Sequence, residues 1–466
     1  MTKTDTPARP GEILLVLGLA SFLVPFMGSS LNLALPRISE VFSFKTVALT
    51  WMATSYLIAS AIFQIPFARI ADLVGRRKIF IWGVAAFSVF TILSGLAPTG
   101  WVLIVLRALS GVSSAMMFGT SMAILTSSFP ANRRGWAMGI NTAVVYSSLA
   151  AGPFLGGLLT HYWGWQSVFF VCGAVGIVVV ILAHLYLRHE WVARGETFDW
   201  VGSLVYGLGL FGLIYGFTRL PTAMGFVWIA VGTVAFVSFV GYEKQCPAPV
   251  FDVRLFSGNR VFALSSLSAL INYASNSAVA FMLSLYLQYL RGFDARTAGL
   301  ILISQACVQS LCSLYSGRLS DRVNAASLAT IGMGVSVCGL TGLFFVTAAT
   351  PVYMLIGLLA LLGIGFGIFS SPNTNVIMSS VDVKQYGQAS ASTGTMRLTG
   401  QAVSMGIAGM AVALQVGNKK ITPEVYPQFL NSVHITFGIF AVLCLVGVYA
   451  SLRRKRGGEQ PCSAGG

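Results

Sequence analysis

Long apolar runs separated by short polar links fill nearly the whole chain. A helix that crosses a bilayer needs about 20 apolar residues, and the chain contains fourteen such runs. They span residues 13–36, 46–67, 79–97, 101–125, 136–160, 167–187, 200–218, 224–242, 261–288, 298–316, 326–347, 351–371, 390–415 and 430–452. The pattern predicts an all-α polytopic membrane protein with fourteen spans.

An internal repeat divides these spans. Residues 317–323 echo residues 68–74 at an offset of 249 positions. Six spans with short links need only about 180–200 residues, so the surplus predicts two additional spans in the middle. We expect an N-terminal six-helix bundle (1–187), a two-helix insert with its linkers (188–258), and a C-terminal six-helix bundle with a basic tail (259–466). The insert is the least secure part, because its two runs are Gly-rich and closely linked.

Charge placement orients the spans. The chain is 56% hydrophobic and 9% charged, which excludes a soluble globular class. With the N-terminus placed inside, twenty of the 29 Lys and Arg residues fall in inside segments, seven fall in outside loops, and two lie within spans. The positive-inside rule therefore predicts that both termini are cytoplasmic. The net charge of +15 then reflects topology and anionic lipid rather than nucleic-acid binding.

The link between the second and third runs is a candidate gate. It is very short, and it carries one carboxylate among several cations together with a glycine that permits a tight turn; the gating candidates are Arg69, Asp72, Gly75, Arg76 and Arg77. An Asp–Arg pair here could form in one conformation and release in another. A purely topogenic basic loop is the alternative. The second copy of the link keeps Asp321 and Arg322 but has Asn324 and Ala325 where Gly75 and Arg76 stand, which predicts a weaker latch.

Two further patterns lie inside spans. Arg107 is in the middle of the fourth run, where a charge is costly unless it faces the bundle interior or a cavity; snorkelling to one face is the alternative. The fifth run contains Gly152, Pro153, Gly156 and Gly157. Proline kinks a helix and small residues admit a close neighbour, so ordinary helix packing also explains this run.

These motifs resemble the major facilitator superfamily, and in particular its fourteen-span drug:proton antiporters. The link resembles the superfamily's loop motif, and Arg107 stands in its Arg-x-x-Gln-Gly pattern with Ser110 in place of the Gln. The Gly152–Gly157 run matches the Gly-Pro-x-x-Gly-Gly signature of exporters. The resemblance covers residues 13–452 and implies a major facilitator fold, two halves that rock about a central site, and a link that stabilises the outward-open state.

The chain departs from that family where protons are bound. Many members carry an Asp in the first span at the position of Met27, and none of the fourteen runs has an Asp or Glu deep inside it. The remaining proton-coupling candidates are Arg107, Asp72 and His434. Histidine titrates near neutral pH, although an ordinary interfacial histidine is the favoured interpretation of His434.

Polar residues at mid-span are the candidates for the substrate cavity. They are Asn32, Gln64, Asn141, Tyr146, Asn272, Asn276, Gln305, Gln309, Asn375, Arg397 and Gln401. Hydrogen bonding between helices is the alternative for about half of them. If Arg107 and Arg397 both face the cavity, its potential is positive and favours neutral, zwitterionic or anionic cargo.

The sequence therefore predicts a secondary active transporter, not an enzyme, in the cytoplasmic membrane. The expected activity is export of small amphipathic compounds by proton antiport through alternating access, and an uptake permease driven by proton symport is the alternative. The expected partners are the substrate, protons and the lipid bilayer, with the protein acting as a monomer. No cofactor, metal or nucleic acid is expected, since no Cys-x-x-Cys pair and no phosphate-binding loop are present.

Overall fold

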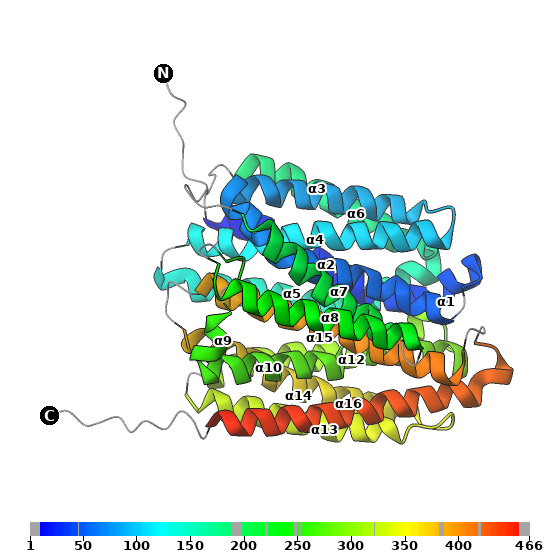
Figure 1. Cartoon of the computed structure of the whole chain (residues 1–466). Coiled ribbons are helices and arrows are strands. Elements are labelled where there is room, and N and C mark those ends of the chain that lie inside the picture. The colour runs from blue at the N-terminus through cyan, green and yellow to red at the C-terminus, as the bar shows by residue number, and fades with distance from the viewer. Residues whose placement is uncertain are drawn as a thin grey trace.

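A computed structural model of the chain shows a bundle of long helices (Figure 1). The structure describes residues 10–44, 46–129, 131–187, 198–219, 222–246, 249–251, 253–320, 322–381, 386–417 and 421–455. All regular elements in these segments are helices, and fourteen of the helical stretches are long and apolar enough to cross a membrane. The predicted fourteen spans are confirmed.

The first six helices form one group. They are α1 (Pro10–Phe42), α2 (Thr46–Val74), α3 (Arg76–Gly95), α4 (Gly100–Ser128), α5 (Ala131–Trp163) and α6 (Gln166–Tyr186). Their mutual packing runs through the pairs α2–α4, α1–α5, α3–α4 and α3–α6. Polar side chains cap the N-termini of several helices. At the start of α4, for example, the Thr99 side chain accepts a hydrogen bond from the backbone N–H of Val102.

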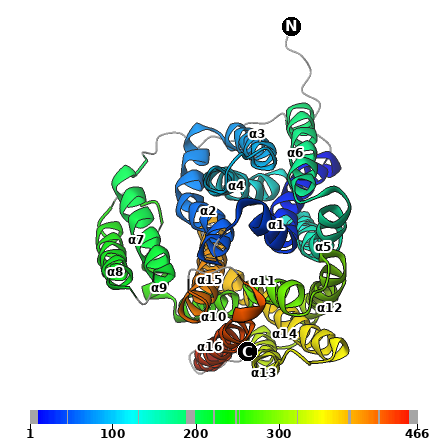
Figure 2. The same cartoon turned by 90° about the vertical axis from the view of Figure 1, so that its right-hand side faces the viewer.

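The last group repeats this plan. It comprises α9 (Arg254–Gly258), α10 (Arg260–Asn276), α11 (Val279–Leu285), the π-helical turn η1 (Tyr286–Leu290), α12 (Ala295–Ser320), α13 (Ala325–Phe344), α14 (Val352–Ser379), α15 (Tyr386–Gln415), the short 3-10 turn η3 (Pro423–Val425) and α16 (Tyr426–Lys455). Viewed along the bundle, the two groups lie on opposite sides, and they meet where α5 packs on α12 and α2 packs on α15 (Figure 2).

One predicted span is less regular than expected. The run 261–288 forms α10, an interruption at Ser277 and Ala278, then α11 and η1. At the interruption the Ala278 backbone N–H donates to Ser404 Oγ of α15 over 2.9 Å. That side chain replaces the partner that a continuous helix would have supplied within the backbone.

The insert forms two helices of spanning length, α7 (Trp200–Thr218) and α8 (Ala223–Glu243). They pack on each other through glycines: a Cβ added at Gly212 would lie 2.7 Å from the Cα of Gly232. The pair lies to one side of the bundle, with α7 facing it (Figure 2). Tyr206 of α7 is 2% exposed, its hydroxyl donates to the Ala61 carbonyl of α2 over 3.3 Å, and it belongs to an apolar cluster that includes Leu398 of α15.

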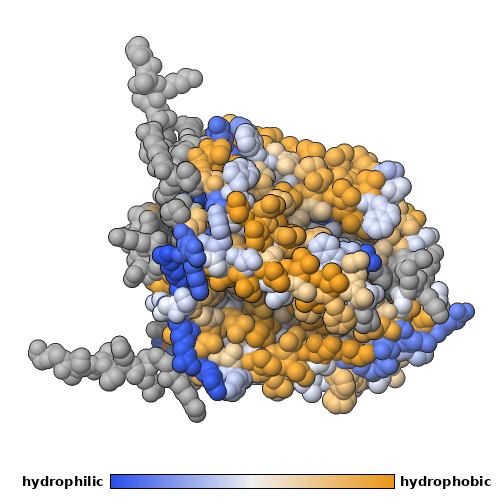
Figure 3. Space-filling view, viewed as in Figure 1, coloured by the Kyte–Doolittle hydropathy of each residue, from blue (hydrophilic) through white to orange (hydrophobic). Residues whose placement is uncertain are grey.

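The outer surface is that of a membrane protein. Apolar residues dominate the viewed flank, and hydrophilic residues gather toward its two ends (Figure 3). On the insert, Trp200, Leu204 and Val234 are among the most exposed apolar side chains. Both described ends of the chain, Pro10 and Lys455, lie at the same end of the bundle, here called the terminal end, and the opposite end is called the distal end (Figure 1).

Candidate functional site

The link between α2 and α3 forms a compact polar corner at the terminal end. Gly75 joins the two helices with a φ of 126°, a backbone conformation that L side chains rarely adopt. Asp72 Oδ1 accepts from Arg76 Nε over 2.6 Å, and Arg76 Nη1 donates to Ser127 Oγ of α4 over 3.0 Å. Arg77 Nε donates to the Leu187 carbonyl just after α6. These bonds tie the link to helices of its own half, and Arg69 is half-buried on α2.

The corresponding corner of the second half is built differently. Arg322 is exposed, and Asp321 lies outside the described residues. Asn324 begins α13 as an N-cap, with Oδ1 accepting from the Ser327 N–H over 3.1 Å, and its φ of −60° is one that any residue adopts. No unusual backbone conformation is therefore required at the position that corresponds to Gly75.

Arg454 of α16 supplies the charge of this second corner, and the sequence analysis missed it. Its side chain is 3% exposed. Nη1 donates to Ser265 Oγ (3.0 Å) and Asn373 Oδ1 (2.8 Å), and Nη2 donates to the Ala326 carbonyl (2.9 Å) and Ser451 Oγ (3.1 Å). Counting Arg454 with the basic tail hid it. Its neighbours Arg453 and Leu452 are exposed, so only a helical phase argument across α16 could have singled it out.

Arg107 lies inside the first half, as the sequence predicted. It is 2% exposed, and its guanidinium carbon stands 4.6 Å from the centre of the Tyr56 ring on α2. This geometry is a cation–π contact. One turn further along α4, a Cβ at Gly111 would lie 2.3 Å from the Tyr56 carbonyl, so glycine there allows α2 and α4 to approach. The Arg107 Nε and Tyr56 hydroxyl atoms are buried and have no hydrogen-bond partner in the described part of the chain.

The glycines of α5 lie between helices of both halves. A Cβ at Gly152 or Gly156 would overlap Ser29 or Ser30 of α1, and Ser30 Oγ donates to the Gly152 carbonyl over 3.0 Å. On the other side, a Cβ at Gly157 would lie 2.7 Å from the Ala295 carbonyl of α12. Facing it, a Cβ at Gly299 of α12 would lie 2.2 Å from the carbonyl of Pro153. The motif therefore allows three helices, drawn from both halves, to pack at backbone distance.

Polar contacts join the halves toward the distal end. Ser284 Oγ donates to the Asn32 carbonyl over 2.6 Å, and Gln288 Nε2 donates to the Leu33 carbonyl over 3.4 Å. Closer to the rim, His161 Nδ1 of α5 lies 3.1 Å from Asp294 Oδ2, which precedes α12. Hydrogen bonding to Thr297 lowers the pKa of the Asp294 carboxyl, so this group stays charged at neutral pH. The described halves are thus tied together at the end that lies away from the termini.

Four of the predicted cavity residues are buried polar side chains. Gln64, Asn141, Asn272 and Asn276 are buried, and each has a side-chain oxygen without a hydrogen-bond partner in the described residues. Such atoms are uncommon, because buried polar groups normally find partners. The group suits a site that offers hydrogen bonds to a ligand.

The remaining cavity candidates are more varied. Tyr146 of α5 bonds Ser370 Oγ of α14 across the halves at 2.6 Å. Gln309 is buried, whereas Gln305 and Gln401 are half-buried. Asn375 is exposed near the end of α14 and donates to Ser320 Oγ. These positions range from the seam to the terminal end.

Arg397 and His434 complete the predicted set. Arg397 of α15 is half-buried, and its guanidinium carbon stands 5.3 Å from the centre of the Phe118 ring on α4, in the other half. His434 Nε2 lies 2.6 Å from the Val346 carbonyl beyond the distal end of α13, inside the second half. The contact of His434 is that of a structural histidine.

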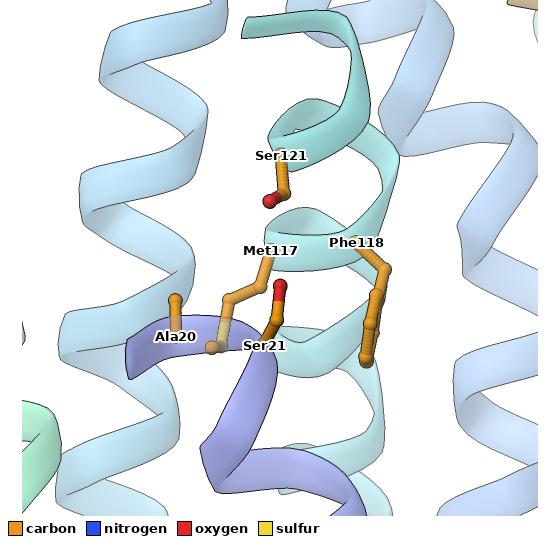
Figure 4. Close-up of a pocket in the computed structure, with 5 residues that line it drawn as sticks. All are labelled: Ala20, Ser21, Met117, Phe118 and Ser121. Atoms are coloured by element: carbon orange, nitrogen blue, oxygen red, sulfur yellow. The ribbon is translucent and has the colours of Figure 1, made fainter. Parts of the chain in front are cut away.

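A small pocket adjoins Phe118. It is a narrow recess lined by Ala20, Ser21, Met117, Phe118 and Ser121 of α1 and α4. The hydroxyls of Ser21 and Ser121 point into the same space, beside Met117 (Figure 4). The pocket therefore combines apolar walls with two groups that can donate or accept a hydrogen bond. Clusters of three or more His, Cys, Asp or Glu side chains that could hold a metal are not found in the described segments.

Two six-helix groups with polar side chains along their seam define a membrane transporter of the alternating-access type. The sequence model of the Major Facilitator Superfamily matches residues 17–242 and 265–464, so the chain belongs to that superfamily. It is therefore a secondary transporter and not an enzyme, and the resemblance drawn from its motifs is confirmed.

Several curated relatives are similar over most of their length. The chain is 31% identical to the cephamycin export protein CmcT of Amycolatopsis lactamdurans, covering 94% of this chain and 92% of the relative. It is 29% identical to the multidrug resistance protein Stp of Mycobacterium tuberculosis, covering 86% and 75%. It is also 26% identical to the riboflavin transporter RibZ of Clostridioides difficile, covering 83% and 84%.

Solved structures share the fold. A bacterial homologue of the human lysosomal transporter Spinster, in an inward-facing and unoccupied conformation, superposes with a TM-score of 0.71 at 17% identity. The match covers 96% of this chain and 97% of that one. At this identity the likeness supports the fold alone.

Proposed function

We propose that the protein exports small amphipathic compounds across the cytoplasmic membrane in exchange for protons. The Gly152–Gly157 motif carries this proposal, because its glycines lie at the point where α1, α5 and α12 meet. A helix junction in this place influences how the two halves separate on the distal side. Relatives named for drug resistance and for export favour the same direction. A relative named as a riboflavin transporter keeps uptake by proton symport as the second candidate.

The proposed orientation places the terminal end in the cytoplasm. With this orientation the contacts between the halves at Asn32, Asp294 and the α5 glycines lie on the outside, and we infer that they close the outside in an inward-facing state. In this state the α2–α3 link bonds within its own half. We infer that Asp72 and Arg76 engage the second half when the terminal end closes, which makes the link a latch of the outward-open state.

Proton exchange can be measured without knowing the preferred cargo. Everted membrane vesicles are energised so that their lumen becomes acidic, and the quenching of an acridine dye reports the gradient. A compound that is exchanged for protons enters the lumen and releases quenching. We expect release by some members of a panel of anionic, neutral and cationic amphipathic compounds.

The control is the Asp72→Asn protein at matched abundance, for which we expect strongly reduced release. An uptake symporter would not release quenching when compound is added to the bath, because its protons and cargo leave the lumen together. Failure of every compound with well-expressed native protein contradicts proton-driven export.

A further inference from the structure

Two arginines from opposite halves lie beside one aromatic residue in the interior. Arg107 is 2% exposed and stacks on Tyr56, and Arg397 stacks on Phe118. Tyr56 lies close enough to both for their charges to act on its hydroxyl group. Tyr273 of α10 also interacts electrostatically with the Arg397 charge and with Tyr146 of α5. The two cations thus belong to one central region that both halves build.

Among the described residues, no carboxylate forms an ion pair with either arginine. Acidic residues within the fourteen spans lie within three residues of a span end, namely Glu12, Glu40, Asp72, Glu243 and Glu424. Neither arginine forms an ion pair in the described part of the chain. Arg107 Nε has no hydrogen-bond partner there, although it is buried.

A buried charge without a partner is costly, and the cost is greatest in a membrane interior. A cation–π contact returns much less free energy than the burial of an unpaired charge costs. Amide and hydroxyl groups nearby add dipoles but no negative charge. A negatively charged ligand would balance the arginines, and a guanidinium binds a carboxylate through two parallel hydrogen bonds.

The surroundings define the rest of the ligand. Phe118, which carries the Arg397 contact, also lines the pocket between α1 and α4. Apolar side chains and the hydroxyls of Ser21 and Ser121 form its walls (Figure 4). A ligand with one anionic group against Arg397 and an aromatic or aliphatic body against Phe118 and Met117 at the mouth of this recess would match both features.

We propose that the central site binds amphipathic organic anions, with Arg397 contacting the anionic group and Arg107 adding a fixed positive potential. This inference rests on the proposed function, since it names the class of cargo for the same site. It also explains how a site without a buried carboxylate can serve an exporter, because the cargo brings the negative charge. Cationic drugs are excluded by the same field.

Two dyes of one skeleton test the charge preference directly. Carboxyfluorescein is an anion at neutral pH and rhodamine 6G is a cation, and both are xanthenes. Binding to the purified full chain in nanodiscs is followed by fluorescence anisotropy, without any gradient. We expect carboxyfluorescein to bind at least tenfold more tightly, which corresponds to about 1.4 kcal/mol.

Single substitutions identify which arginine causes the preference for the anionic dye. Arg397→Gln is expected to weaken carboxyfluorescein binding about tenfold and, because it removes a repelling positive charge, to strengthen rhodamine 6G binding, whereas Arg397→Lys keeps most of the preference. Arg107→Gln should weaken the anion less, because its charge acts from further away. The matched control is Arg219→Gln, which removes one exposed positive charge at the distal end of α7 and should change neither dye.

Equal or tighter binding of rhodamine 6G, undetectable binding of carboxyfluorescein, or a preference that survives Arg397→Gln would overturn the proposal. Size-exclusion profiles identify any variant that fails to fold, and Arg397→Lys then carries the test. Because this measurement uses equilibrium binding, its result is independent of proton exchange. Cargo class and transport direction can therefore fail separately.

Discussion

In each half, an arginine joins two corresponding helices at the terminal end: α3 and α6 in the first half, and α13 and α16 in the second. The arginine lies on the first helix of the pair in one half and on the second helix in the other. In the first half, Arg77 at the start of α3 donates to the carbonyl of Leu187 at the end of α6. In the second half, Arg454 near the end of α16 donates to the carbonyl of Ala326 at the start of α13. At the repeat offset of 249 residues, Ala326 stands where Arg77 stands. The arginine has changed helices while the connection has been kept.

The comparison separates two roles that the first corner combines. The first corner holds Asp72, Arg76 and Arg77 in half-exposed positions, where an ion pair can break and form again. The second corner buries a single guanidinium in four hydrogen bonds and has lost the glycine turn. We infer that the first corner is adapted to change between states and the second to hold its helices fixed. Four predictions test this difference.

The largest effect is expected from Arg454→Ala. It leaves Asn373 Oδ1 without its arginine donor and opens a cavity, so the free energy of unfolding should fall by about 3 kcal/mol. Equilibrium unfolding in mixed micelles, followed by tryptophan fluorescence, measures it. The exposed neighbour Arg453 provides the control, since Arg453→Ala should cost less than about 0.5 kcal/mol. Equal losses in the two variants would contradict a fixing role for Arg454.

The next effect concerns the turn. Gly75→Ala places a Cβ at a φ of 126° and should cost about 2 kcal/mol of stability. The matched change in the other half, Asn324→Ala, removes an N-cap and should cost only about 1 kcal/mol. The same micelle titration compares them, and a larger loss for Asn324→Ala would reverse the proposed difference between the corners.

A smaller effect is expected from Arg77→Ala, which removes one half-exposed hydrogen bond worth about 1 kcal/mol. Moving the arginine of the second half to the position that corresponds to Arg77 tests whether the two connections are equivalent. Adding Ala326→Arg to Arg454→Ala should recover about 1 kcal/mol, because an arginine at the Arg77-equivalent position can reach the end of α16. No recovery in the double variant would show that the two arginines are not equivalent connections.

The smallest effect on stability is expected from Asp72→Asn. An exposed or half-exposed ion pair four residues apart contributes about 0.3–0.5 kcal/mol, so unfolding should hardly change. Transport should nevertheless fall by several fold if the pair biases one conformation. Transport is measured by dye quenching in vesicles, and the free energy of unfolding is measured on protein from the same preparation. Parallel losses of transport and stability would mean that the link has only a structural role.

Periodicity and length predicted the fourteen spans, the repeat and the two-helix insert, because each span must be apolar over a fixed length. The same reasoning predicted that Arg107 is interior, since a mid-span charge has few alternatives. Arg454 could not be found this way. It stands in a run of four basic residues, and its burial depends on packing against Asn373 and Ser265, which are far away in sequence.

The site was predicted in outline only. Gln64, Asn272 and Arg397 were chosen for being polar within apolar runs; Gln64 lies against Gly394 and Arg397 against Phe118, each in the other half, while Asn272 is buried within its own half. Their partners could not be inferred, because contacts between helices depend on rotation and depth that one sequence does not reveal. For the same reason the His161–Asp294 pair was missed, as each residue reads alone as a polar loop residue.

The position of Tyr206 also bears on the route by which lipid-soluble molecules enter. Its ring lies buried between α2 and α15, and α7 and α8 cover the flank where those helices meet. A lipid tail on this flank meets the outer face of the insert instead of the joint between the halves. A compound dissolved in either leaflet would have to displace α7 to pass here, so the insert closes this flank to lateral entry.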